Sequence, residues 1–215
     1  VIDINPKNWK AKFNLYINYI KNNKYTEALP LVNDVLKLKT NYQPALRDKG
    51  LILYHLKKPN EGLALVLDSI KQNPKDYIAL NILGLIYILF AKYDLAEKTF
   101  TKAIKINANY APSYNNLGRV FDLINKKDLA LIHYKKALDI NPTFQEAINN
   151  IAIYYNNTGN YKKAISLYLK AQQKRSKTDE TILYNIAISY MNLEKYKIAE
   201  DYFKKSYALN SNSGK

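Results

Sequence analysis

The sequence repeats a pattern of small and large residues about every 34 positions. The first phase of the pattern holds one tyrosine and five small residues, at Tyr16, Gly50, Gly84, Gly118, Ala152 and Ala187. Twelve positions later a second small residue recurs, at Ala28, Gly62, Ala96, Ala130, Ala164 and Ala199. Sixteen positions after the first phase a large side chain recurs, at Val32, Val66, Phe100, Tyr134, Tyr168 and Phe203. Small residues that face large ones let two helices pack closely, so each unit is predicted to be a hairpin of two antiparallel helices.

Turn-forming residues separate the predicted helices. Between the two helices of a unit lie Asn22–Asn23, Pro59–Asn60, residues 125–128 and Thr158–Gly159–Asn160. At the junctions between units, in one recurring phase, lie Pro6, Pro74 and Pro142. Glycine, asparagine and proline are typical of places where helices stop. The chain is therefore predicted to be all-α.

One apolar stretch raises the question of a membrane segment. Residues 82–90 read ILGLIYILF, and the apolar stretch around them runs from Ile78 to Ala91 before Lys92. A helix needs roughly 18 to 20 consecutive apolar residues to cross a bilayer. The stretch is too short, so no transmembrane segment is predicted. In the repeat pattern it is the first helix of the third unit.

Two middle units carry a motif known from one repeat family. In the fourth unit the motif comprises Tyr114, Leu117, Gly118, Phe121, Ala130, Tyr134, Ala137 and Pro142. In the third it comprises Leu80, Leu83, Gly84, Tyr87, Ala96, Phe100 and Ala103. In these residues the sequence resembles the tetratricopeptide repeat (TPR) family, and the resemblance covers nearly the whole chain. It implies a right-handed superhelical α-solenoid of six antiparallel helix-turn-helix repeats.

The phase of the pattern sets the expected repeat boundaries. We expect repeats at residues 9–42, 43–76, 77–110, 111–144, 145–179 and 180–213. Residues 1–8 are interpreted as the tail of a preceding repeat, so the chain is expected to be a fragment of a longer array. The fifth repeat has one extra residue, with Thr178 or Asp179 available to cap the following helix.

The resemblance also implies a concave groove, lined by the second, fifth, sixth, ninth, twelfth and thirteenth residues of each repeat. Its N-terminal half is predicted to be apolar, with candidate partner-binding residues Phe13, Ile17, Leu51, Tyr54, Ile78, Ile82, Leu85, Ile88 and Leu89. Its C-terminal half is predicted to be polar, with candidate residues Asn115, Asn116, Arg119, Asn149, Asn150 and Asn185.

Each half of the predicted groove has two interpretations. The apolar half could anchor a helix or apolar peptide, or neighbouring helices or an upstream repeat could cover it. Asparagine both donates and accepts hydrogen bonds, so an asparagine ladder could hold the main chain of an extended peptide. Some TPR proteins, including the O-linked N-acetylglucosamine transferases, hold peptides this way at the phase of Asn116, Asn150 and Asn185. Alternatively, these asparagines reflect the general family pattern and a bias toward A/T-rich codons.

The amino-acid composition limits the kinds of binding site and catalysis that the chain can provide. The chain has no cysteine and two histidines at different phases of the repeat, so no metal or cofactor site is predicted and the cellular compartment stays open. No nucleophile motif or phosphate-binding loop is present, so no catalytic residue is predicted. Only three of 33 basic residues are arginine, which argues against specific nucleic-acid recognition. The net charge of +15 is interpreted as a solvated lysine face, with nonspecific attraction to acidic partners as the alternative.

These observations predict a non-enzymatic scaffold or adaptor that binds a protein or peptide ligand in its groove. The carboxylate clamp of chaperone-binding TPR domains is not predicted, because no window of three repeats carries its lysine, asparagine and arginine set. A self-assembling scaffold that forms homo-oligomers through its repeat ends or groove is one alternative. A substrate-recruiting region of a larger enzyme is another.

Overall fold

The computed structural model describes residues 8–173 and 179–213, and within these ranges the chain forms helices and no strand. The expected all-α fold is thus confirmed. The twelve helices of the described residues are α1 (Trp9–Lys21), α2 (Tyr25–Leu38), α3 (Gln43–His55), α4 (Pro59–Gln72), α5 (Tyr77–Leu89), α6 (Tyr93–Ile106), α7 (Ala111–Leu123), α8 (Lys127–Ile140), α9 (Gln145–Asn157), α10 (Tyr161–Gln173), α11 (Glu180–Asn192) and α12 (Tyr196–Ser213).

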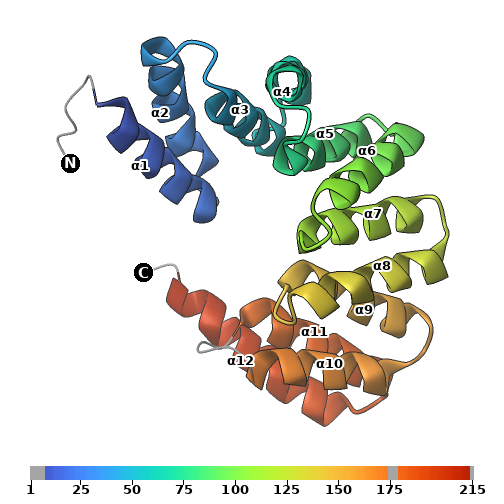
Figure 1. Ribbon diagram of the computed structural model, residues 1–215. Helices are drawn as coiled ribbons and strands as arrows, with labels where there is room; N and C mark the ends of the chain where they lie inside the picture. The colour runs from blue at the N-terminus through green and yellow to red at the C-terminus, as the bar shows by residue number, and fades with distance from the viewer. Residues whose placement is uncertain (1–7, 174–178, 214–215) are drawn as a thin grey trace. The chain divides into compact units, whose positions relative to one another are not determined.

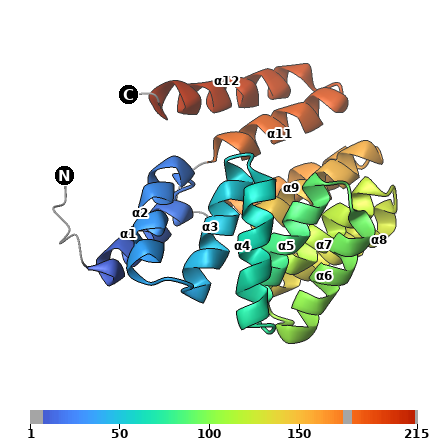
Figure 2. The ribbon, with the colours of Figure 1, turned by 90° about the horizontal axis from the view of Figure 1, so that it is seen from above.

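Consecutive helices pair as hairpins within each unit: α1 with α2, α3 with α4, α5 with α6, α9 with α10, and α11 with α12 (Figure 1). The chain divides into two compact units, Val1–Val120 and Phe121–Lys215. In the first unit α2 packs on α3 and α4 packs on α5, and Figure 2 shows α3, α4 and α5 side by side. In the second unit α8 packs on α9 and α10 packs on α11. Each unit is therefore a stack of helical hairpins, the arrangement of an α-solenoid.

Two of the sequence predictions concern residues at or beyond the limits of the described ranges. The interpretation of residues 1–8 as the tail of a preceding repeat lies outside the described residues, apart from Asn8. Of the two predicted capping residues before α11, Thr178 is also outside them. Asp179 is the N-cap of α11, and its side chain accepts a hydrogen bond from the backbone N–H of Ile182 at 3.2 Å.

The small and large residues of the repeat meet as predicted. Gly50 on α3 lies against Val66 on α4, and a Cβ on Gly50 would come within 2.3 Å of Val66 Cγ2. Among the small residues of the second helices, Ala28, Ala96 and Ala164 are fully buried. The chain therefore uses small residues to bring the two helices of a hairpin into contact.

Every first helix ends in the same turn. The second residue after each of these helices has a positive φ, between 53° and 73°, at Asn23, Lys57, Ala91, Asn125, Gly159 and Glu194. The next residue donates its N–H to the carbonyl five residues earlier, as from Lys92 to Tyr87 at 2.9 Å and from Asn160 to Tyr155 at 2.7 Å. This is the Schellman motif, in which a left-handed residue lets the chain satisfy carbonyls at the helix end.

The predicted turn at Pro59–Asn60 is displaced from the observed one. Pro59 is the first residue of α4, and the positive-φ residue of this turn is Lys57. Proline favours the first position of a helix because its fixed φ suits the helix and its missing N–H is not needed there. The proline therefore marks the start of the second helix and not the turn itself.

Candidate partner-binding surfaces

The first helices carry the predicted groove residues, and their exposure depends on their phase in the repeat. The sixth residue is buried in three successive repeats, at Asp48, Ile82 and Asn116. The ninth and thirteenth residues are more accessible. Leu89 on α5 is 43% exposed and Ile153 on α9 is 49% exposed. Fewer positions of the repeat therefore offer surface to a partner than the six that the family resemblance implies.

Residues at the sixth position reach back to the preceding repeat. Asp48 accepts a hydrogen bond from the Tyr16 hydroxyl at 3.1 Å, and the Asn116 amide donates to Asn81 Oδ1 at 3.1 Å. In the second unit the Asn185 side chain is hydrogen-bonded to the Tyr168 hydroxyl. Burial raises the pKa of Tyr168 to about 12, and the bond with Asn185 opposes this rise. Two of the three ladder asparagines thus join neighbouring repeats.

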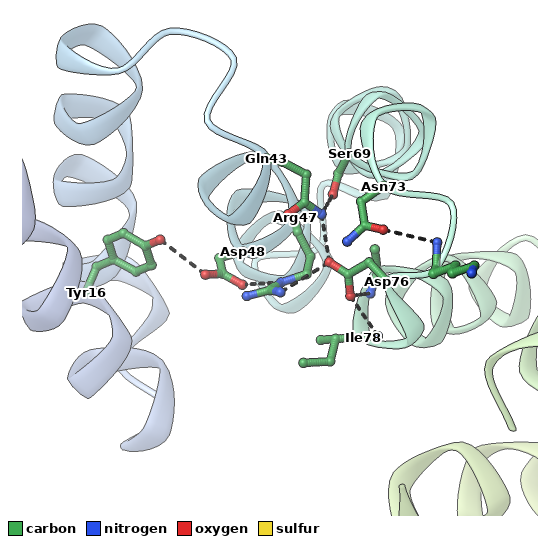
Figure 3. Close-up of polar contacts among 10 residues, drawn as sticks. Tyr16, Gln43, Arg47, Asp48, Ser69, Asn73, Asp76 and Ile78 are labelled. Atoms are coloured by element: carbon green, nitrogen blue, oxygen red, sulfur yellow. Dashed lines mark hydrogen bonds and ion pairs between the residues drawn. The ribbon is translucent and has the colours of Figure 1, made fainter. Parts of the chain in front are cut away.

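A polar network surrounds Arg47 on α3, inside the part of the groove predicted to be apolar (Figure 3). Arg47 Nε lies 2.8 Å from Asp48 Oδ1, and its Nη1 lies 3.2 Å from Asp76 Oδ2. The Gln43 amide donates to Asp76 Oδ2 and to Ser69 Oγ, both at 2.7 Å. The network thus connects α1, α3, α4 and the start of α5.

The two carboxylates of this network have opposite pKa shifts. Burial raises the pKa of Asp48, because it outweighs the contacts with Arg47 and Tyr16. Burial alone would also raise the pKa of Asp76, but hydrogen bonds from Gln43 and the Ala79 N–H, together with Arg47, lower it. Asp76 is the N-cap of α5 and accepts from two backbone N–H groups. Arg47 is thus shared by two buried carboxylates, of which Asp76 is held in its ionised form and Asp48 is not favoured in that form.

Sequence reasoning missed most of this network because its central pair, Arg47 and Asp48, does not recur. Arginine and aspartate occupy these two positions in one repeat only, and periodicity reveals only residues that recur; Gln43 and Asp76 do have counterparts, in Gln145 and Asp179. One signal was present, since Asp76 directly precedes the predicted start of a helix, where an aspartate favours capping.

Most of the predicted apolar groove residues in the first unit are partly buried. Two of them, Phe13 and Ile17, pack against the buried cluster around Tyr16 and Val32. Three others pack against the cluster around Val66 and Ile86, namely Leu51, Tyr54 and Ile78. Ile82 is 1% exposed and belongs to that second cluster. In ILGLIYILF, then, Ile82 is in the core, Leu85 and Ile88 are partly buried, and Leu89 is exposed.

The predicted polar residues also divide by burial. Asn115 and Asn116, in the first unit, are 3% and 7% exposed and offer little surface to a ligand. Arg119, Asn149, Asn150 and Asn185 are partly buried. The Asn149 side chain accepts a hydrogen bond from Gln145 at 3.0 Å.

A pocket of about 250 Å³ in the second unit brings several groove phases together. It lies among the end of α7, α8 and α9, and its lining includes Asn150, Ile153 and Asn157, the sixth, ninth and thirteenth residues of their repeat. Tyr134 and Tyr154 line it as well. The Tyr154 hydroxyl donates to Asp128 at 2.7 Å, and the ion pair of Lys127 with Asp122 borders the pocket at 2.6 Å. The pocket thus combines the apolar side chain of Ile153 with several polar groups.

The described residues show no arrangement typical of metal or membrane sites. No group of three or more histidine, cysteine or acidic side chains in them could hold a metal ion. His55 instead stacks on Tyr25, with ring centroids 3.9 Å apart, and His133 stacks on Phe121 at 5.1 Å. No helix in the described part of the chain has the length and hydrophobicity required to cross a bilayer.

Comparison with family models decides the family. Tetratricopeptide repeat models match residues 77–143, 133–166 and 180–213, which together make up more than half of the chain. The chain belongs to the tetratricopeptide repeat family. TPR repeats are commonly protein-interaction scaffolds and typically non-catalytic. No curated protein sequence matches the chain significantly.

Solved structures of TPR proteins resemble most of the chain. A TPR protein of Thermus thermophilus is 22% identical, with 85% of this chain and 99% of that one covered and a TM-score of 0.78. PilW, described as a type IV pilus biogenesis factor, is 19% identical, with coverages of 93% and 92% and a TM-score of 0.75. PilF of Pseudomonas aeruginosa is 16% identical, with coverages of 94% and 91% and a TM-score of 0.71. These similarities support the shared fold.

Proposed function

We propose that this TPR chain is a non-enzymatic scaffold that holds a peptide or helical segment of a partner protein on its first helices. The observation that carries the proposal is the pocket of about 250 Å³ on α9, where Asn150, Ile153 and Asn157 meet. Pockets with an apolar lining and a few polar groups are the usual place for ligands. Here the lining residues also occupy the phases that the TPR resemblance assigns to the groove.

The exposed residues indicate which chemical groups of a partner they could contact. Ile153 and Leu89 are each almost half exposed, so a partner's apolar side chain would remove further apolar surface from water. Asn157 supplies a donor and an acceptor at the edge of the pocket and could bond to the main chain of the bound segment. We leave Ile82, Asn115 and Asn116 out of the proposed contact set because they are buried.

Matched substitutions test the pocket in the second unit. Peptides would be selected from a displayed random library on the wild-type chain, and their affinities would be measured by fluorescence anisotropy. Ile153→Glu should weaken selected peptides about tenfold, because it places a carboxylate where apolar surface is covered. Ile132→Glu is the control, since Ile132 on α8 is 59% exposed and does not line the pocket.

A second matched pair tests the first unit. Leu89 on α5 and Leu95 on α6 are 43% and 42% exposed, so changing either to glutamate disturbs a similar amount of surface. Only Leu89→Glu should weaken peptides that bind the first unit. If neither Ile153→Glu nor Leu89→Glu weakens any selected peptide more than its control does, the first helices are not the binding surface.

Self-association is a second candidate, supported by exposed apolar residues on the last helix. On α12, Tyr196 and Tyr207 are 65% and 76% exposed, and Ile198 is 39% exposed. Association of two chains through such side chains would remove their apolar surface from water. Light scattering over a concentration series should show a mass that rises with concentration and that Tyr207→Lys lowers. A constant monomer mass would exclude this candidate.

A further inference from the structure

A second pocket in the second unit has a different character from the one on α9. It has a volume of about 460 Å³ and lies between α10 and the end of α11. Its lining consists of Lys162, Ile165, Ser166, Leu169, Lys170, Gln173, Tyr190, Leu193 and Lys195. It shares no lining residue with the pocket on α9, and most of its lining comes from α10, the second helix of its repeat.

The charge around this pocket is positive and unbalanced. Lys162, Lys170 and Lys195 are exposed, and no aspartate or glutamate lines the pocket. The sequence of α10 contains no acidic residue at all. Among the described residues, no carboxylate lies within ion-pair distance of these three lysines. Other lysines of the same unit are neutralised, as Lys127 is by Asp122 and Lys204 by Glu200, both at 2.6 Å.

The floor of the pocket is apolar. Ile165 is 6% exposed, and Leu169 and Leu193 are partly buried. Leu169 also packs against the buried cluster that contains Tyr168 and Ile186. A pocket lined by both apolar side chains and ammonium groups suits a ligand that has both an apolar group and carboxylates, since each part then meets its complement.

We propose that this pocket binds an acidic peptide segment of a partner protein, with an apolar side chain on the floor and flanking carboxylates near the three lysines. A volume of about 460 Å³ is in the range of pockets that hold compact ligands. A nucleic acid fits less well. The lining contains no arginine, and one face of the Tyr190 ring is already covered by Tyr202, with ring centroids 5.6 Å apart.

The proposal can be tested with synthetic peptides and the full chain. A fluorescein-labelled peptide with the sequence EELFEE should bind, and its affinity should fall as salt is raised. The peptides QQLFQQ and EEGSEE remove the carboxylates and the apolar pair respectively, and both should bind at least about fivefold more weakly. Equal binding of QQLFQQ would overturn the proposal.

Variants of the chain locate the binding. Changing Lys162, Lys170 and Lys195 together to glutamine should weaken EELFEE by at least about tenfold, at roughly two- to threefold per lysine. The control changes three exposed lysines of the same unit outside the pocket to glutamine, namely Lys126, Lys135 and Lys136. An equal loss in the control would show nonspecific attraction and overturn the proposal.

A further variant fills the pocket without changing its charge. Ser166 is exposed, so Ser166→Phe should leave the fold intact, as circular dichroism would verify, while EELFEE binding is lost.

Ile153→Glu should leave EELFEE binding unchanged, which distinguishes failure of this proposal from failure of the proposed function. If a thymidylate oligonucleotide or phosphatidylserine vesicles lose binding in the triple variant and EELFEE does not, the pocket recognises phosphate and the peptide proposal is wrong.

Discussion

Asp48 shows that the same position of the repeat can have different roles in different repeats. It occupies the sixth place of its first helix, which the family resemblance assigns to the groove, yet it is 5% exposed and bonds to Tyr16 of the preceding repeat. Tyr16 itself stands where most of the repeats have glycine or alanine. The hydroxyl that this larger residue brings into the interior needs a partner, and Asp48 supplies it.

The raised pKa of Asp48 gives a pH-dependent prediction. An acid whose folded pKa lies above its unfolded value destabilises the fold progressively as pH rises between the two values. Asp48→Asn keeps the size of the side chain and does not titrate. The wild type should therefore lose stability relative to Asp48→Asn as pH rises from about 4, near the ordinary pKa of aspartate, through the raised pKa.

Urea denaturation midpoints of both proteins over this pH range provide the measurement. Asp48→Ala is the contrasting variant. It leaves the Tyr16 hydroxyl without its partner and Arg47 with Asp76 alone, so it should be less stable than Asp48→Asn at every pH, by about 1 to 3 kcal/mol. A gap between the wild type and Asp48→Asn that stays constant or reverses with pH would show that Asp48 is ionised throughout.

At the scale of the helix, the repeated Schellman turn is the most regular feature of the chain. Its left-handed position holds glycine once, asparagine twice, and lysine, alanine and glutamate once each. A left-handed conformation costs roughly 1 kcal/mol or more in residues with a Cβ, less in asparagine and nothing in glycine. The same turn therefore carries a different strain in different repeats.

Exchanging alanine and glycine between two of these turns tests this strain. Ala91→Gly should stabilise the protein by about 0.5 to 1 kcal/mol, and Gly159→Ala should destabilise it by about 1 kcal/mol. A Cβ on Gly159 would meet no atom within 4 Å, so backbone strain is the only cost. Asn125→Gly is the control and should change stability by a few tenths of a kcal/mol. Thermal unfolding measures all three, and equal effects at residues 91 and 125 would contradict the explanation.

The helices were predictable from the sequence because the signals for them recur. Gly50, Gly84 and Gly118 mark the same place in successive hairpins, and one interface geometry explains all three. The contacts of Arg47 with Asp48 and Asp76 occur once, and no periodicity reveals them. Exposure was also hard to predict. Ile82 and Leu89 lie on one apolar helix and were assigned to one surface, but only packing between repeats decides that Ile82 is buried and Leu89 is not.

At the scale of the whole molecule, stability should be distributed along the chain. Repeats in a solenoid contact mainly their neighbours, so opening of one hairpin need not open distant ones. The division into Val1–Val120 and Phe121–Lys215 agrees with this expectation. A change in one unit should therefore affect hydrogen exchange mostly within that unit.

Two glycine substitutions make this testable by hydrogen-exchange mass spectrometry. Gly50→Ala forces a Cβ against Val66 and the Gly62 carbonyl, and should cost about 1 to 3 kcal/mol. It should lower the protection of amides in α1 to α5 far more than in α9 to α11. Gly159→Ala strains the turn after α9 and should give the reverse pattern. If either substitution instead lowered protection equally in all helices, the chain would unfold as one cooperative body, and stability could not be assigned repeat by repeat.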